Sequence, residues 1–237
     1  MMAGDQTQAN NSWSAPCDTT VHTGCQGDAN RGIVALQQWL TDLNGAATPA
    51  RFAAVDAQLR RHLTQSITGL NSLVVASQAN DQDGMNRAFL VGLSGRLWTD
   101  TVVPGILASK QVSTTAYVDS VRTQKQSLDN CSLCQALVAS KQVNCSVSST
   151  PTCEDLLGGA ADQVATFQSV VARYAAPSSL SAKDASLELD LANADSALMA
   201  MRSALTANDQ ARFNNGLMLL QRALTAVAGD VSNIMQG

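Results

Sequence analysis

Apolar residues recur at helical spacing through most of the chain. In the C-terminal part, positions from Leu180 to Leu205 repeat at alternating spacings of four and three residues and are apolar except for Asp184. A second run with the same spacing extends from Phe213 to Ile234. This spacing places the apolar side chains on one face of an α-helix, whereas the period of two that is typical of strands is missing at useful length. The pattern therefore predicts an all-α fold.

The chain also matches itself when it is shifted by 128 residues. The aligned residues include Cys17 with Cys145, Cys25 with Cys153, Trp39 with Phe167, Pro49 with Pro177, Asp56 with Asp184, Leu59 with Leu187, Leu70 with Leu198, and the string 79–82 with 207–210. Two cysteines, a proline and a four-residue string rarely share one ungapped shift by chance. We therefore predict an internal duplication.

Each copy is expected to contain a cysteine-bounded loop followed by three helices. The expected helices lie near 29–45, 50–78 and 82–109 in the first copy and near 154–175, 178–206 and 209–235 in the second. The predicted architecture is two tandem up-and-down helical bundles with about seven helices in all, stapled by disulfides. The expected domains are a disordered or foreign N-terminus over 1–16, a first repeat over 17–111, a connecting helix over 112–144 and a second repeat over 145–237.

The connecting segment is amphipathic over 112–141, with a break predicted near Asp129 and Asn130. We expect it to pack on the first copy through Tyr117, Val121, Leu128, Leu137 and Val138.

Several local features of the helices follow from residue type. Pro49 and Pro177 should mark the entry to the second helix of each copy. Pro104 should kink or end the third helix of the first copy. Asn80 and Asn208 should cap the third helices. In that third helix of the first copy we expect an apolar face of Phe89, Leu93, Leu97 and Ile106, and we expect His62 on a solvated helix flank.

Composition excludes several classes of protein. Charged residues make up only 14% of the chain and the net charge is −4, which argues against a nucleic-acid-binding protein with a basic face. Apolar residues make up 45%, too many for a disordered chain. No apolar run approaches the roughly 20 residues that are needed to cross a bilayer.

Six cysteines in Ser- and Thr-rich surroundings favour disulfides and an oxidising, extracytoplasmic compartment. The duplication favours the pairs Cys17–Cys25 and Cys145–Cys153, which leaves Cys131–Cys134, whereas a nested set would join Cys131 to Cys153 and Cys134 to Cys145. The chain starts without the basic and apolar segments of a signal peptide. We therefore expect a signal or anchor that is missing from this sequence.

Two alternatives give the cysteines a chemical role. The Cys131-x-x-Cys134 spacing is that of redox-active thiols, although the βαβ context of thioredoxin-like proteins is missing. Cys17, His22 and Cys25 together would supply three zinc ligands, but the second copy has Thr150 at the position that matches His22. We therefore expect neither a metal nor a cofactor.

Asp56 and Asp184 form a matched pair of carboxylates on otherwise apolar helix faces. Such a residue is either a ligand contact or an acid tolerated near a helix N-terminus, where the helix dipole favours negative charge. Enzyme signatures such as a hydrolytic triad or a phosphate-binding loop are missing.

The sequence thus predicts a non-enzymatic, extracytoplasmic helical module that binds an unknown protein or a small ligand, as the exposed part of a lipoprotein, secreted protein or receptor. No nucleic-acid partner is expected, and membrane contact is expected only through an absent anchor. The alternatives are a thiol–disulfide or metal-handling protein centred on the cysteines from Cys131 to Cys153, and a self-assembling surface subunit.

Overall fold

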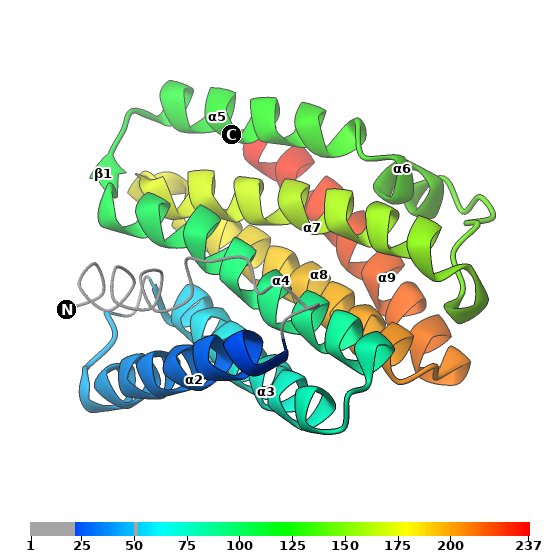
Figure 1. Cartoon of the computed structure of the whole chain (residues 1–237). Helices are drawn as coiled ribbons and strands as arrows, with labels where there is room; N and C mark the ends of the chain where they lie inside the picture. The colour runs from blue at the N-terminus through cyan, green and yellow to red at the C-terminus, as the bar shows by residue number, and fades with distance from the viewer. Residues whose placement is uncertain (1–21, 50–51) are drawn as a thin grey trace. The chain divides into compact units, whose positions relative to one another are not determined.

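The computed structural model describes residues 22–49 and 52–237. They form helices joined by short turns (Figure 1). The chain divides into two compact units, of which the first ends at Thr99 and the second begins at Asp100. This boundary falls inside a helix, α4 (Gln82–Leu107), and the connecting segment belongs to the second unit.

The first unit contains α2 (His22–Gly45), α3 (Ala53–Gln78) and the beginning of α4. Helices α2 and α3 pack against each other, and Leu36, Trp39 and Leu43, which recur at helical spacing along α2, are buried. The small core of this unit is therefore built on the apolar faces that the sequence pattern predicts.

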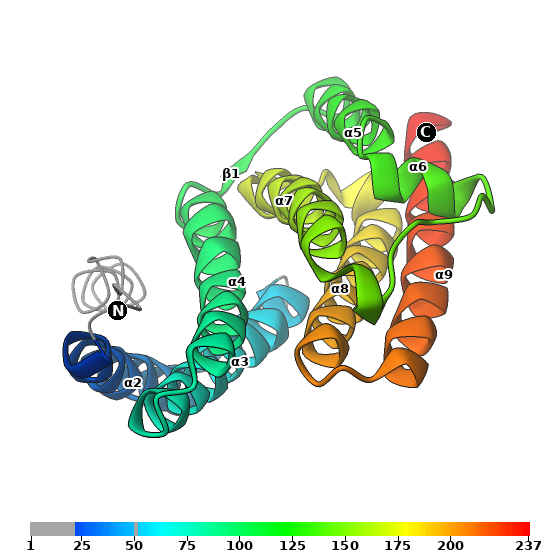
Figure 2. The same ribbon diagram turned by 45° about the vertical axis from the view of Figure 1, so that its right-hand side comes forward.

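The second unit contains the rest of α4 and a longer series of elements. They are β1 (Lys110–Gln111), α5 (Thr114–Asp129), α6 (Ser132–Val138), η2 (Val147–Ser149), α7 (Thr150–Arg173), β2 (Tyr174–Ala175), η3 (Ser178–Leu180), α8 (Ser181–Thr206) and α9 (Gln210–Met235). Helices α7, α8 and α9 run up and down, and α5 and α6 lie over α7 and α9 (Figure 2). Strands β1 and β2 form a parallel pair that aligns Lys110 with Tyr174.

The all-α prediction is confirmed, because the described residues contain eight α-helices and one pair of two-residue strands. The break in the connecting helix is also confirmed, since α5 ends at Asp129 and α6 begins at Ser132. The expected packing of this helix on the first copy is wrong. Buried Tyr117 and Val121 face the second unit, where α5 contacts α7 and α9, while Val138 is 49% exposed.

The three helices of the first copy and those of the second begin and end at positions 128 residues apart: α2 with α7, α3 with α8, and α4 with α9. The turns agree as well, because Asn80 and Asn208 both adopt the left-handed conformation, with φ of 54° and 53°. This correspondence supports the predicted duplication, which itself stays a prediction.

The turn before each third helix corrects one expectation. Asn80 and Asn208 do not cap α4 and α9 but occupy the left-handed position, which asparagine tolerates better than most residues. The capping side chains are those of Asp81 and Asp209, whose Oδ1 atoms accept backbone N–H groups three residues later at 2.9 and 3.0 Å.

The buried face of α4 differs from the expected one. Leu97 is 47% exposed, whereas Gly92 and Gly95 are buried against α3. A Cβ atom added to Gly69 of α3 would lie 2.7 Å from the Cα atom of Gly92, and Ser66 Oγ donates to the Gly92 carbonyl at 3.1 Å. Glycines carry no hydrophobic signal, so the sequence pattern pointed to the neighbouring leucines instead.

Two other expectations are corrected. His62 is not solvated: it is 3% exposed, and its ring stacks on Trp98 with centroids 4.4 Å apart, because α3 turns this flank toward α4. Pro104 does not end α4, which continues to Leu107. Pro177 stands before the 3-10 turn η3 rather than in the first turn of α8, whereas Pro49 lies just before the undescribed residues 50–51.

We predict that Gly69→Ala lowers the free energy of unfolding by about 1–3 kcal/mol, because the new methyl group overlaps the α4 backbone. The matched control is Gly159→Ala on α7, where no atom lies within 4 Å of the added Cβ. That substitution should raise stability by about 0.5–1 kcal/mol through helix propensity. Urea unfolding followed by circular dichroism measures both, and equal effects of the two variants would contradict the close helix crossing.

Candidate functional site

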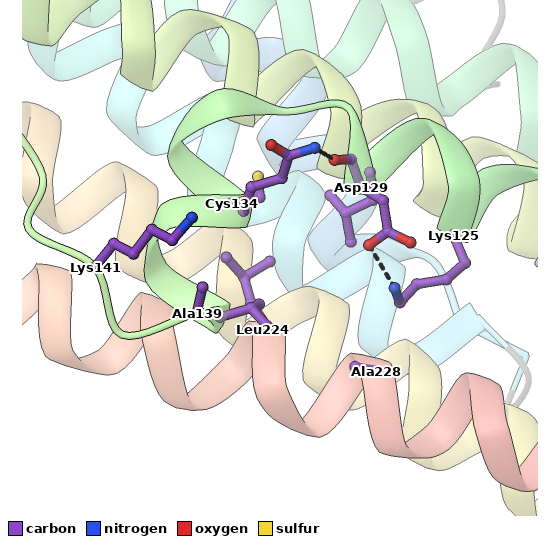
Figure 3. A pocket seen from close by; sticks show the side chains of 10 residues that line it. Lys125, Asp129, Cys134, Ala139, Lys141, Leu224 and Ala228 are labelled. Carbon is purple, nitrogen blue, oxygen red and sulfur yellow. Dashed lines mark hydrogen bonds and ion pairs between the residues drawn. The ribbon is translucent and has the colours of Figure 1, made fainter.

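A pocket of about 380 Å³ lies in the second unit where α5, α6 and α9 meet (Figure 3). Its apolar lining includes Leu128 of α5 and Leu224 and Ala228 of α9. Its polar lining consists of Lys125, Asp129, Gln135 and Lys141. The pocket therefore combines an apolar floor with a charged rim, as small-ligand sites commonly do.

The wall formed by α6 is held by contacts from two directions. Leu133 and Leu137 are 1% and 4% exposed and anchor the short helix in the core. From α9, the Gln221 side-chain amide donates to the Leu137 carbonyl at 3.0 Å and to Ser140 Oγ at 3.1 Å. The Gln221 amide thus provides a donor for a carbonyl group at the C-terminal end of α6. Such support matters because a helix of seven residues is unstable on its own.

The charges at the rim are unequally paired. Lys125 donates to the carboxylate of Asp129, and Gln135 donates to the Asp129 carbonyl. The side-chain ammonium group of Lys141, by contrast, makes no hydrogen bond or ion pair with the described part of the chain, and only the Lys141 backbone N–H donates, to the Ala136 carbonyl. Its ammonium group lies on the side of the pocket where Cys134 is found (Figure 3). The rim thus has one cation whose charge is not balanced by a neighbour.

The disulfide Cys131–Cys134 forms the end of the same wall. Its Cα atoms are 5.2 Å apart, and Cys134 lines the pocket. Cys131 is the N-cap of α6, and its Sγ atom accepts the Cys134 N–H at 3.2 Å. This bridge closes the turn that follows α5 and fixes where α6 begins.

The second described disulfide joins Cys145 to Cys153, with Cα atoms 4.9 Å apart. The pairing expected from the duplication is therefore confirmed for both described bridges, and the nested alternative is wrong. No described cysteine is free. Cys17 lies outside the described residues, so the predicted Cys17–Cys25 pair stays a prediction, although Cys25 itself is buried.

Asp56, the first of the two candidate carboxylates, is engaged within the first unit. Arg60, one turn later on α3, donates to it from Nε at 2.7 Å. The same guanidinium group also donates to the Leu43 carbonyl at 2.8 Å and to the Asn44 side chain. Asp56 thus orients an arginine that caps the end of α2, which favours a structural role over a ligand contact.

Asp184, the second candidate, has a different partner. It accepts a hydrogen bond from the Tyr117 hydroxyl of α5, and Glu188 follows it by one turn on α8. Burial raises the pKa of Asp184 to about 6, although the bond from Tyr117 lowers it. Burial and the neighbouring Asp184 raise the pKa of Glu188 to about 8. Burial and the two carboxyls also raise the pKa of Tyr117 well above its usual range.

Sequence reasoning missed Glu188. A signal was present in the sequence, because the shift of 128 residues places Glu188 on Arg60 and so reverses a charge beside a matched aspartate. The sequence pattern also did not point to Arg202 of α8. Burial lowers the pKa of Arg202, whereas the acidic side chains Asp162, Asp195 and Glu154 raise it. This second cluster is a buried cation surrounded by acids, which gives it a structural explanation.

No group of three histidine, cysteine or acidic side chains that could hold an ion occurs among the described residues, and Cys17 of the zinc alternative lies outside them. Within residues 22–49 and 52–237, no helix combines the length and hydrophobicity needed to cross a membrane. Comparison with protein families, curated proteins and solved structures finds no match to this chain.

We predict that Arg60→Gln lowers the free energy of unfolding by about 1–2 kcal/mol, because Asp56 and the end of α2 lose a charged donor. The control is Arg87→Gln, since Arg87 lies 4.0 Å from Asp81 in an exposed pair. That change should cost less than about 0.5 kcal/mol. Chemical denaturation measures both variants, and an unchanged stability of Arg60→Gln would show that the α2 cap contributes nothing.

Proposed function

We propose that this protein is a non-enzymatic, extracytoplasmic helical-bundle module that binds a small organic anion in the pocket between α5, α6 and α9. The observation that carries the proposal is the unbalanced ammonium group of Lys141 beside an apolar floor. A carboxylate would pair with Lys141, and a short hydrocarbon body would cover Leu128 and Leu224.

The charge of the rim favours a single negative charge on the ligand. Lys125 and Asp129 neutralise each other, so Lys141 leaves the lining with one net positive charge. The volume of about 380 Å³ is near the lower end of the range for small-molecule sites. A monocarboxylate with a short aliphatic or single-ring body fits both properties.

Two features support binding outside the cytoplasm over catalysis inside it. Disulfides persist in oxidising compartments, and the second unit has two of them, of which Cys131–Cys134 borders the pocket. The side chains that line the pocket include neither a histidine nor a serine, so a nucleophile with its general base is not assembled there.

A second candidate function is thiol–disulfide exchange at Cys131–Cys134. It is favoured by one observation, namely that Cys134 borders the pocket while Cys131 Sγ accepts a backbone N–H at the start of α6. A thiolate released at Cys131 would keep that hydrogen bond. Because Cys131 and Cys134 are 8% and 3% exposed, a structural bridge remains the better-supported function of the pair.

We predict that hexanoate and benzoate bind the pocket and that Lys141→Gln weakens their binding roughly tenfold, because it removes the charged donor. Two-dimensional NMR titration measures the affinity and locates the ligand at α5, α6 and α9. The matched control is Lys110→Gln on β1, outside the pocket, which should leave affinity unchanged.

Neutral hexanol separates charge from hydrophobic contact, since its weaker binding should not respond to Lys141→Gln. The proposal fails if neither acid perturbs the resonances of Leu128 and Leu224, or if Lys110→Gln reduces affinity as much as Lys141→Gln does.

For the disulfides, we expect alkylation of the untreated protein to add no mass and mild dithiothreitol to leave Cys131–Cys134 closed, because the sulfur atoms are buried. Peptide mapping after differential alkylation measures each bridge. Selective opening of Cys131–Cys134 while Cys145–Cys153 stays closed would favour exchange chemistry over the structural role.

A further inference from the structure

The two copies differ in charge at one pair of matched positions. In the first, Asp56 is followed one turn later by Arg60, and the two side chains form an ion pair. In the second, the corresponding positions carry Asp184 and Glu188, two groups that repel each other when both are ionised. The helices α3 and α8 that carry these pairs have equivalent bounds, so the difference lies in the side chains.

The acidic pair lies under the beginning of α5. Tyr117, four residues after the Ser113 cap, is fully buried, and its hydroxyl donates to the Asp184 carboxylate. Asp184 and Glu188 are each half-buried. The bond from Tyr117 to Asp184 is therefore a direct tie between the N-terminal end of α5 and α8, and Glu188 stands beside it.

Charged groups on the surrounding elements are engaged elsewhere. On α8, Lys183 donates to the Asn233 carbonyl of α9 at 2.7 Å. On α9, Asp230 accepts a hydrogen bond from Ser186 at 3.0 Å. Lys110 of β1 lies 5.6 Å from the centre of the Tyr174 ring, and Arg173 lies in the last turn of α7. Within the described residues, no ion pair joins Asp184 or Glu188 to a cation.

We propose that Tyr117, Asp184 and Glu188 form a pH-sensitive latch, which holds the N-terminal end of α5 on α8 while Glu188 is protonated and loosens it when both carboxyls are ionised. A protonated Glu188 leaves a single negative charge, which the Tyr117 hydroxyl stabilises. Loss of that proton places two like charges side by side under α5, and lifting α5 away hydrates them.

The direction of the pH effect follows from linkage. With α5 docked, the pKa of Asp184 is about 6 and that of Glu188 about 8, whereas exposed carboxyls titrate near 4. The docked state therefore binds protons more tightly than the open state. Docking is strongest below about pH 4, weakens as the pH rises through 6 and 8, and stays constant above that range.

Hydrogen exchange of the full-length protein tests the latch. We expect the protection factors of amides in residues 114–121 to fall at least about tenfold between pH 6 and pH 9, after correction for the intrinsic exchange rate. Amides in the middle of α9 provide the internal reference. In Glu188→Gln, which is neutral at every pH, most of this decrease should disappear.

Two further variants keep the test informative. Arg60→Gln changes the matched position of the first copy and should leave the pH dependence of α5 unaltered. Asp184→Asn replaces Glu188→Gln if the latter fails to fold, and it should reduce the pH dependence without abolishing it, because burial still raises the pKa of Glu188. Carbon-13 NMR of the carboxyl groups then identifies the titrating residue.

The latch is overturned if Glu188 titrates near the ordinary value of a carboxyl, or if protection of α5 in Glu188→Gln falls with pH as it does in the unmodified protein. Neither result depends on whether the pocket at the other end of α5 binds an anion.

Discussion

Burial of the apolar face shared by α8 and α9 is the interaction on which the second unit depends. Leu198, Met201 and Leu220 are at most 1% exposed, and each such side chain contributes about 1.5–3 kcal/mol when it is buried. The two helices form a platform for α7, α5 and α6. Without it, α6 would not persist, because seven residues are too few for an isolated helix. The pocket therefore exists only as a consequence of this packing.

The pocket and the acidic cluster lie at opposite ends of α5. In both, the position of a charged side chain depends on how the helices of the second unit pack. Lys141 lines the pocket because the disulfide and Gln221 hold α6 against α9. Asp184 meets Tyr117 because α5 lies over the beginning of α8. Both places hold charge that is only partly balanced, which is positive at the pocket and negative at the acidic cluster. Binding of an anion and sensing of protons are the corresponding proposals.

The two units show how one helical pattern supports different chemistry. The α3–α4 crossing in the first is close because Gly69 meets Gly92, whereas the residue matching Gly92 in the second is Leu220, which fills the core. The carboxylate at the start of the second helix is neutralised by Arg60 in the first unit and accompanied by Glu188 in the second. Helices with equivalent bounds thus accommodate both the change in side-chain volume from Gly92 to Leu220 and the reversal of charge from Arg60 to Glu188.

Helical spacing was sufficient to predict the all-α fold and most helix ends, because periodicity and turn residues such as Asn80 act over a few neighbouring positions. The predicted duplication suggested the disulfide pair Cys145–Cys153 and left Cys131–Cys134 as the remaining pair. The docking of α5 on the second unit, the glycine face of α4 and the burial of His62 were not predictable in this way. Nor was the meeting of Tyr117 with Asp184 or of α5 with α9 at the pocket. These depend on contacts between residues far apart in the chain, and only the packed structure decides which of several similar helix faces is covered.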